Sequence, residues 1–368
     1  MKLQSKEFRD ACRTILFAID NKEASLFNET LELKSENSIL SMNVTNREYY
    51  TTVKFNLEQP EEFHASVKAS LFLKLIDKIT TEYIDLSIDG NSVKVKGNGE
   101  YKLPIIYNND VMLELPTIDI TNVTNEMEIS SDILQSIVNY NSKELLRGTP
   151  TRDVQKYYYI DNLGAITYTS GACVNSFTLP NEVKMLLSEK VVKLFKLFKD
   201  TDIVKFKMSQ EAISEEMIQT RVEFLSGNVD IRAKLSDTGL ITSVPVDSIR
   251  KMATREYPYS VVMDKDQLLQ ILNRLMLFTE GKNYGSFDFT QDKLTISDFS
   301  GDNKEELLLT SECPTLQNYS TILNLNNLKL VLEGCPDQHI TICFGDSRSV
   351  LIKKNNISDL VPELKVSK

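Results

Sequence analysis

The sequence repeats one order of elements three times, and this repeat limits the folds that the chain can adopt. Each copy holds two short amphipathic segments with helical periodicity, set among segments in which apolar and polar residues alternate. The first amphipathic segments begin at Ser5, Ser130 and Asp264, and the second ones begin at Ala69, Ser188 and Leu325. The copies recur after roughly 120 to 135 residues, the length of a domain rather than of a solenoid repeat. We therefore predict three domains of one kind, covering residues 1–124, 125–253 and 254–368.

A strand–turn–strand pattern follows each second amphipathic segment. The stretches are DLSIDGNSVKVKG, IVKFKMSQEA with RVEFLSGNVDIRAKL, and HITICFGDSRSVLIKK. Alternation at period two, broken by Asp-Gly, Asn or Gly turns, is typical of half-buried antiparallel hairpins. Such a sheet under two helices predicts an α+β fold. Six layers of this kind could close a ring with helices inside and sheets outside, and edge-to-edge pairing of the sheets would remove exposed strand edges.

The composition is that of an ordinary globular chain with a net charge of −10. No apolar run approaches the roughly 20 residues that span a bilayer, and the first residues, MKLQSKEFRD, lack the apolar core of a secretory signal. The five cysteines are scattered without a CxxC pair, which favours reduced thiols, and with two histidines an imidazole-based zinc site is not expected. We expect a soluble cytoplasmic protein that has no metal, no cofactor and no membrane partner.

Basic residues gather on one flank of the amphipathic segments, although the chain is acidic overall. In the first copy these residues are Lys6, Arg9, Arg13, Lys74 and Lys78, and in the second copy they are Lys190, Lys193 and Lys196. The third copy shows the pattern weakly. Lysine on an exposed helix face is commonly no more than solvated surface. Recurrence at equivalent places of a repeat favours a shared use, and neutralisation of DNA phosphates suits Lys and Arg.

Two longer stretches add a resemblance to a known family. They are GEYKLPIIYNNDVMLELP, from Gly99 to Pro116, and DVQKYYYIDNLGAITYTSGACVNSFTLP, from Asp153 to Pro180. With the chain length, the order of elements and the triple repeat, they resemble the bacterial β sliding clamp, the processivity subunit of the replicative DNA polymerase. The resemblance implies a ring-shaped homodimer that encircles duplex DNA without reading its sequence. It also implies two protein partners, the replicative DNA polymerase and a clamp loader, and no catalytic residue.

The resemblance implies three sites in this chain. The DNA-binding residues would be the basic ones named above together with Arg147, Arg152, Gln155 and Lys156. A partner-peptide groove would be lined by Thr169, Gly171, Cys173, Val174, Pro245, Arg250, Met252, Leu360, Pro362 and Leu364. The dimer interface would include Tyr101, Leu103, Leu277 and Phe278. An ordinary polar loop and plain core packing account for many of these residue types as well. The His-Arg pair usual after the turn glycine is Ala172–Cys173 here, which leaves the motif preference of the groove open.

Two other classes of protein remain open. The sequence contains no GxGxxG, GxxxxGK[ST], HExxH or GxSxG motif, so common enzyme signatures lack support. The acidic pairs Glu215–Glu216 and Glu305–Glu306 lie in charged runs that are more simply read as solvated surface. A metal-dependent DNA-processing enzyme would cleave DNA with magnesium, whereas a structural assembly protein would form open lattices instead of a discrete dimer.

Overall fold

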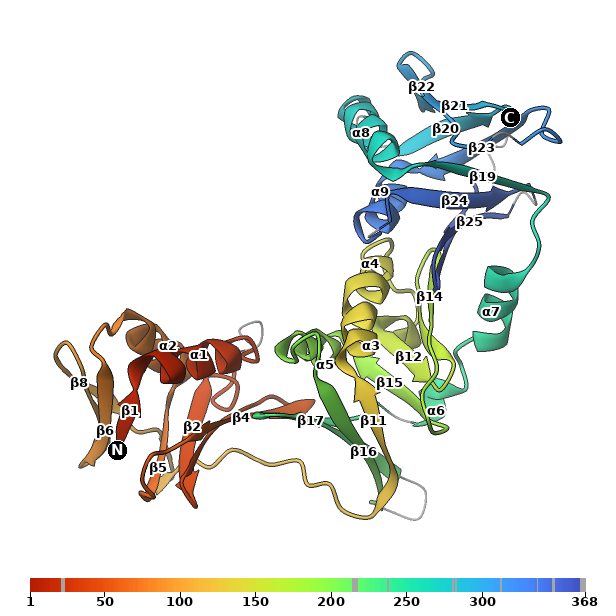
Figure 1. Cartoon of the computed structure of the whole chain (residues 1–368). Helices are drawn as coiled ribbons and strands as arrows, with labels where there is room; N and C mark the ends of the chain where they lie inside the picture. Colours follow the sequence, from red (N-terminus) through yellow and green to blue (C-terminus); the bar gives the residue numbers. More distant parts are fainter. Residues whose placement is uncertain are drawn as a thin grey trace. The chain divides into compact units, whose positions relative to one another are not determined.

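The computed structural model describes residues 1–20, 24–213, 218–236, 238–279, 281, 283–311, 313–335, 337–345 and 348–364. The chain forms two compact units (Figure 1). The first unit contains residues 1–132 and 193–238, and the second contains residues 133–192 and 239–368. Both are built from antiparallel sheets and helices, so the predicted α+β class is confirmed. The three predicted domain boundaries stay a prediction.

The first unit contains an eight-stranded sheet and a four-stranded sheet. The larger sheet has the order β11 (Val123–Ser130), β16 (Ile203–Ala212), β17 (Ile218–Ser226), β18 (Val229–Lys234), β4 (Tyr49–Asn56), β3 (Ile39–Thr45), β2 (Thr30–Glu36) and β5 (Phe63–Lys68). The smaller sheet has the order β1 (Lys2–Gln4), β6 (Tyr83–Asp89), β7 (Ser92–Lys96) and β8 (Glu100–Pro104). A two-stranded ribbon, β9 (Tyr107–Asn108) and β10 (Val111–Met112), follows β8.

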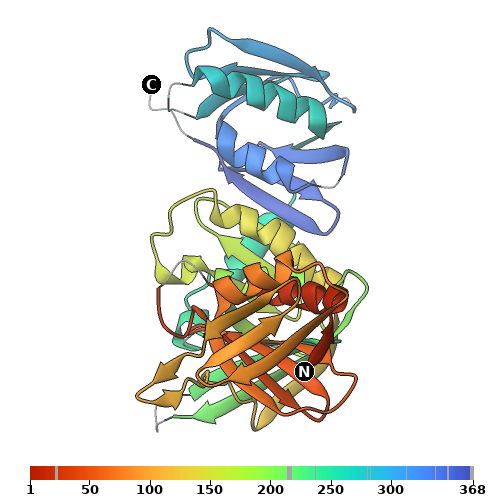
Figure 2. The same cartoon turned by 90° about the vertical axis from the view of Figure 1, so that its left-hand side faces the viewer.

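Helices α1 (Ser5–Leu16) and α2 (Ala69–Lys78) lie side by side in the first unit (Figures 1 and 2). The side chain of Gln4 caps α1 by accepting a hydrogen bond from the Glu7 amide at 2.8 Å. The buried face of α1 follows the helical period, and Phe8 packs edge-on against Phe55 and Phe72. The predicted helices at Ser5 and Ala69 are therefore present.

The second unit repeats this plan. Its eight-stranded sheet has the order β15 (Lys184–Ser188), β12 (Tyr157–Asp161), β13 (Gly164–Tyr168), β14 (Ala172–Ser176), β26 (Ile357–Pro362), β25 (Ser349–Lys354), β24 (His339–Phe344) and β19 (Tyr259–Asp264). Its four-stranded sheet has the order β22 (Lys304–Leu308), β21 (Lys293–Asp298), β20 (Tyr284–Phe289) and β23 (Tyr319–Asn324). Helices α8 (Lys265–Leu275) and α9 (Leu325–Glu333) lie side by side, capped by Asp264 and Asn324 (Figure 2).

The remaining helical elements are short. They are α3 (Ser131–Ser136), the π-helix η1 (Ile137–Asn141), α4 (Ser142–Leu145), α5 (Glu189–Val192), α6 (Thr238–Ile241), α7 (Val246–Thr254), and the 3₁₀ helices η2 (Asp153–Lys156), η3 (Lys193–Leu197) and η4 (Met276–Phe278). Among the described ranges, no helix is both long and apolar enough to cross a membrane.

The two predicted helices of the middle repeat are not continuous α-helices. After α3 the chain widens into η1, which carries the buried side chain of Asn141 toward β13. The Asn141 carbonyl accepts the hydroxyl of Thr167 at 2.9 Å, so the irregular turn satisfies buried polar groups. The segment predicted from Ser188 begins as α5 and tightens into the 3₁₀ helix η3, and it buries Val192 and Phe195.

Strand pairing joins successive repeats at two seams. In the β4–β18 seam, Val53 lies opposite Val229, and in the β14–β26 seam, Ala172 lies opposite Leu360. At the other ends of the smaller sheets, β8 pairs with β7 and β22 pairs with β21, each on one side only within the described residues. Each unit therefore carries one merged sheet, and β8 and β22 are among the edge strands with which a further strand can pair.

Candidate nucleic-acid interface and peptide groove

The basic flank predicted for the first repeat is present on α1 and α2. Lys6, Arg13, Lys74 and Lys78 are exposed and Arg9 is half-buried. Four of these five residues, Lys6 being the exception, line a hollow of about 340 Å³ between the two helices. The charge of this hollow is partly offset, because Asp77 lies 2.9 Å from Arg13 Nη2 and Arg13 lowers the pKa of that carboxyl.

The lysines of the second repeat lie where α5 runs into η3. Lys196 is exposed and Lys193 is half-exposed, and neither has an ion-pair partner among the residues that the structure describes. The apolar neighbours Leu194 and Phe195 are buried. Lys190 is half-buried and makes contacts of its own. The predicted opposition of an apolar and a basic face is therefore present in this segment.

Arg147 is buried, contrary to the prediction that it contacts DNA. Its side chain is 1% exposed; Nη1 lies 2.6 Å from Glu144 Oε2, and Nη2 donates to Asp359 Oδ1. A guanidinium enclosed by two buried carboxylates cannot reach a phosphate. The prediction is corrected: Arg147 ties α4 to β26 inside the second unit.

Arg147 belongs to a buried network of four charges that also includes Lys354. Lys354 Nζ lies 2.7 Å from Asp359 Oδ2 and donates to the carbonyl of Val331 at 2.9 Å. Burial raises the pKa of Glu144. Burial also opposes ionisation of Asp359, but Arg147 and Lys354 outweigh it and lower the pKa of that carboxyl. Sequence analysis missed Glu144 and Asp359; the three-residue spacing of Glu144 on α4 and Arg147 just after it was the available signal.

The loop after α4 divides its predicted residues between surface and interior. Arg152 and Lys156 are exposed, and Lys156 pairs with Asp153 at 2.8 Å. Gln155 is buried, and its Oε1 accepts the amides of Thr151 and Arg152 at 2.7 and 3.1 Å. The prediction for Gln155 is therefore corrected, because its side chain holds the loop in shape instead of facing solvent.

The predicted groove residues of β14 face opposite sides of the sheet. Val174 joins an apolar cluster with Leu360 and with residues of α7, whereas Cys173 is completely buried on the other side. Burial raises the pKa of the Cys173 thiol well above its ordinary value. The prediction that Cys173 lines the groove is therefore corrected. Gly171 fits the turn before β14 because an added Cβ would overlap the carbonyl oxygen of Leu360.

The turn that contains Thr169 and Gly171 is held by hydrogen bonds to the buried side chain of Glu144. Its Oε1 accepts the amides of Thr169 and Gly171 at 3.0 and 3.2 Å, and the Thr169 hydroxyl at 3.0 Å. The other carboxylate oxygen faces Arg147. The buried network therefore fixes the turn at which the predicted groove begins.

Helix α7 supplies the opposite wall of the predicted groove. Arg250 forms a two-pronged ion pair with Asp161, with nitrogen–oxygen distances of 2.6 and 2.8 Å. Met252 and Pro245 are exposed, and α7 contacts both β14 and β26. Six partly buried apolar side chains pack against the cluster beneath: Tyr157, Tyr168, Leu240, Ile241, Val246 and Tyr257. From β26 and the residues after it, Pro362 is half-buried and Leu364 is exposed. Asp161 was missed from sequence.

The predicted interface residues differ in exposure. Leu277 and Phe278 are 79% and 55% exposed on η4 and line a hollow of about 540 Å³. Tyr101 is exposed on the open strand β8. Leu103 is 3% exposed and belongs to the core of the first unit, so the prediction that it contacts a partner is corrected.

Of the two acidic pairs considered for an enzyme, the described pair Glu305–Glu306 forms ion pairs with basic side chains. Glu305 binds Arg274, with Nε to Oε1 at 2.8 Å, and Glu306 binds Lys293 at 2.8 Å. Glu215–Glu216 lies outside the described residues. In the part of the chain that the structure describes, no group of three or more His, Cys, Asp or Glu side chains is arranged to hold a metal ion.

Comparison with known proteins finds similarity to bacterial β sliding clamps in sequence and in structure. No family model matches the chain. The β sliding clamp of Mycoplasmopsis pulmonis is 26% identical over 148 residues, which are 40% of this chain and 36% of that protein. The aligned part thus spans little more than a third of the relative's length.

Several solved structures match over the full length. The DNA polymerase III β subunit of Pseudomonas aeruginosa has a TM-score of 0.82 at 15% identity and covers 100% of both chains. The β subunit of Streptococcus pyogenes has a TM-score of 0.81 at 16% identity, covering 99% of each chain. That of Thermotoga maritima has a TM-score of 0.79 at 13% identity, covering 100% of this chain and 99% of its own.

The chain therefore has the DNA-clamp fold, in which merged antiparallel sheets carry pairs of helices. Its fold is that of the bacterial β sliding clamps, and its sequence is similar to one of them over part of its length. The resemblance drawn from the sequence is confirmed.

Proposed function

We propose that this protein is a DNA sliding clamp that encircles duplex DNA and tethers the replicative DNA polymerase for processive synthesis. The observation that carries the proposal is the full-length likeness to the DNA polymerase III β subunits, at a TM-score of 0.82 over 100% of both chains. The basic flank of the paired helices in an acidic chain supports the same conclusion. The protein would act in the cytoplasm, without a cofactor and without catalysis.

The proposed link to DNA is topological. A closed ring leaves DNA only when it opens or runs off an end, so each phosphate contact can be weak while residence is long. Contacts from Lys6, Lys74, Lys78, Lys193 and Lys196 would attract the duplex without reading its bases. Because this attraction varies little along the helix, the ring can slide. A tethered polymerase would then stay at high effective concentration near the primer end.

The ring would be a homodimer of three-domain protomers that meet head to tail. The open edges of β8 and β22 belong to the smaller sheets of different units, so pairing of β8 with the partner's β22 would give a heterologous contact that closes with two copies. The exposed Leu277 and Phe278 would be covered at this contact, and so would Tyr101 on β8.

The polymerase and a clamp loader would bind through short peptide segments at the predicted groove. Exposed Met252 and Leu364, together with the partly buried tyrosines that pack against the apolar cluster, provide apolar surface for Leu or Phe anchors. Arg250, fixed by Asp161, would set the polar end of this groove.

The test is a measurement of particle mass followed by a retention assay. Light scattering should give twice the chain mass of 41.9 kDa. With a clamp loader and ATP, the protein should stay on nicked circular DNA through gel filtration and leave after the circle is cut. Retention that is equal on circular and linear DNA would contradict encirclement.

A further inference from the structure

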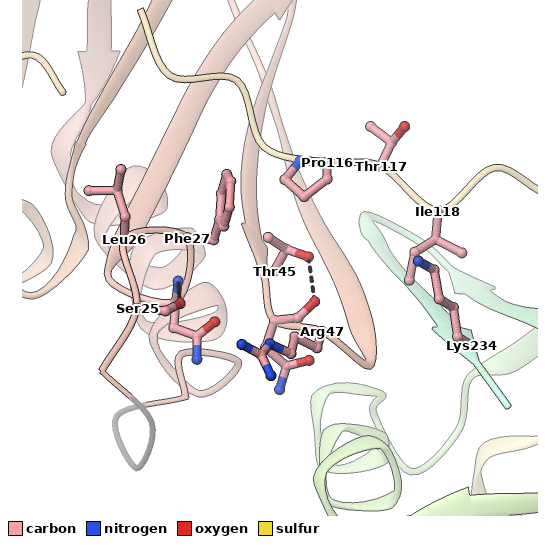
Figure 3. A pocket seen from close by; sticks show the side chains of 11 residues that line it. Ser25, Leu26, Phe27, Thr45, Arg47, Pro116, Thr117, Ile118 and Lys234 are labelled. Atoms are coloured by element: carbon pink, nitrogen blue, oxygen red, sulfur yellow. Dashed lines mark hydrogen bonds between the residues drawn. The ribbon is translucent and has the colours of Figure 1, made fainter. Parts of the chain in front are cut away.

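A cavity of about 610 Å³ lies in the first unit, apart from the surfaces described above (Figure 3). Three segments line it: the turn 25–28 before β2, the turn 45–47 between β3 and β4, and the connecting segment 116–118. Lys234, at the end of β18, completes the wall. The volume falls within the range of ligand pockets, about 300–1,000 Å³.

The turn walls are held in shape by hydrogen bonds. Asn46 Oδ1 accepts the amides of Glu48 and Tyr49 at 2.7 and 2.9 Å, while its Nδ2 donates to Asp20 Oδ2 at 3.2 Å. Ser25 Oγ accepts the amide of Asn28 at 3.1 Å. These bonds keep the cavity formed before any partner arrives, which lowers the entropy cost of binding.

Two arginines of the large sheet hold the connecting segment 116–118 in place. Arg221 Nη1 donates to the carbonyl of Asp119 at 3.0 Å, and Arg232 Nη1 lies 3.5 Å from the carbonyl of Ile118. The side chain of Ile118 is buried with Tyr50, which anchors the segment further. The third wall is therefore also in place.

The cavity combines exposed apolar groups with exposed positive charge. Leu26 and Phe27 are 48% and 39% exposed, and Figure 3 shows them among the side chains that line the cavity. Arg47 and Lys234 are exposed, and neither has an ion-pair partner among the described residues. Two unpaired cations beside an apolar wall, in a chain of net charge −10, favour a ligand that is both acidic and apolar.

The cavity lies at one end of the β4–β18 seam, where the Lys234 amide bonds to the carbonyl of Glu48. The predicted groove lies at the corresponding end of the β14–β26 seam, where the turn before β14 meets β26. In both places a hairpin turn, a merged sheet edge and a connecting segment come together. The cavity and the predicted groove therefore occupy equivalent positions in the topology of the two units, whatever each of them binds.

We propose that this cavity is a second peptide-binding site, which takes a short extended segment of a partner protein with an acidic residue next to a large apolar one. The carboxylate would face the positive charge that Arg47 and Lys234 bring to the cavity, and the apolar side chain would cover Leu26 and Phe27. A DNA backbone would satisfy the two cations but leave the apolar wall exposed to water, so it fits less well.

The test uses two synthetic peptides on the full-length protein. The probe is acetyl-Gly-Asp-Leu-Phe-Gly-amide with a photoreactive benzophenone on the Phe ring; its match carries Asn in place of Asp. Mass spectrometry of the crosslinked protein should place the probe on residues 24–29 or 114–118. The Asn peptide should crosslink at least about tenfold less, because it loses its attraction to both cations. The Arg47→Ala and Lys234→Ala variants should each crosslink about tenfold less, because each removes one of the two cations. Lys205→Ala, an exposed lysine on β16 of the same unit, is the matched control and should crosslink normally.

Three results would overturn the proposal. Crosslinks confined to residues 240–257 would assign the probe to the other groove. Equal labelling by the Asp and Asn peptides would remove the role of the two cations. Displacement of the probe by a 20-base-pair duplex at lower concentration than by unlabelled peptide would show a phosphate site. Circular dichroism melts of all variants exclude unfolding as the cause of lost labelling.

Discussion

Lys354 Nζ lies 2.7 Å from Asp359 Oδ2 in the interior of the second unit, and both side chains are 2% exposed. Arg147 binds the other oxygen of the same carboxylate and also faces Glu144. Two positive and two negative charges therefore balance one another away from water. A buried pair of this kind adds little net stability, but removal of one member leaves an uncompensated charge. The network thus makes the junction of α4, β25 and β26 sensitive to single substitutions.

Substitution of Arg147 should destabilise the fold instead of weakening DNA binding selectively. Arg147→Ala leaves Asp359 and Glu144 with less positive charge, and we expect a loss of about 3–5 kcal/mol in the free energy of unfolding of the second unit. Urea unfolding followed by circular dichroism measures this loss. Arg152→Ala, at an exposed arginine of the same loop, should change stability by less than about 0.5 kcal/mol. A stable Arg147→Ala protein with impaired DNA retention would restore the original interpretation of Arg147.

Charge reversal on η3 should weaken retention on DNA and leave the dimer intact. Lys193→Glu with Lys196→Glu removes two unpaired cations without touching the buried side of the segment. We expect the apparent affinity for nicked circular DNA to fall at least about tenfold, with a salt dependence of log affinity reduced by about 2. Gel filtration after loading measures retention, and light scattering checks the mass. Lys205→Glu serves as the control; if it lowers retention equally, the effect is one of net charge.

The predicted peptide groove is best tested by surface substitutions. Removal of the chain from Leu360 onward would cut into β26, which pairs with both β14 and β25, and would damage the sheet. Met252→Glu and Leu364→Glu change exposed residues only. Each should reduce polymerase stimulation on primed circular DNA at least about tenfold by placing charge in an apolar site. Normal stimulation by both variants, with unchanged melting temperature, would remove these residues from the partner site.

The proposed dimer interface predicts opposite outcomes for two apolar residues. Leu277→Asp replaces an exposed side chain and should give a folded monomer of 41.9 kDa, seen by light scattering. Leu103→Asp places a charge in the core of the first unit and should lower the melting temperature, because a buried charge without a partner is costly. A Leu277→Asp protein that stays dimeric would argue against η4 as part of the interface.

The ion pair of Asp161 with Arg250 should give a stability contribution that depends on pH. Burial raises the pKa of Asp161, but hydrogen bonds from Arg250 and from the Leu163 amide outweigh it and hold the pKa below its usual range. A lowered folded-state pKa means that the stabilisation is complete above the unfolded value of about 3.9 and is lost as the pH falls through the folded value. The melting-temperature gap between wild type and Asp161→Asn should therefore be constant from pH 7 to 5 and narrow below about pH 4. Arg250→Ala should show the same narrowing, whereas a gap that is unchanged down to pH 3 would assign the effect to packing.

Local periodicity was enough to predict the regular helices. The segments at Ser5, Ala69 and Leu325 form α1, α2 and α9 from the first predicted residue, and Asp264 caps α8. Their apolar spacing is a property of neighbouring residues, so it can be read without knowledge of the tertiary structure. The α+β class follows from the same local patterns.

The sites depended on residues that are distant in sequence. Arg147 and its partner Asp359 are 212 positions apart. The sequence around Arg147 therefore does not show that a buried carboxylate binds it in the folded protein. Cys173 and Val174 are neighbours that face opposite sides of β14, and only the three-dimensional structure shows which side carries α7. Arg250 was expected at the groove, but its binding to Asp161 also required the fold.

The two seams between repeats are ladders of backbone hydrogen bonds. This construction affects how many residues of the sequence can change without loss of the fold. A backbone amide and carbonyl are the same in nearly every residue, so the β4–β18 and β14–β26 joints place few demands on side-chain identity. Exceptions are positions such as Gly171, where a side chain would collide with the neighbouring strand. Two sequences can therefore differ at most positions, as at the 15% identity with the Pseudomonas subunit, and still form the same architecture.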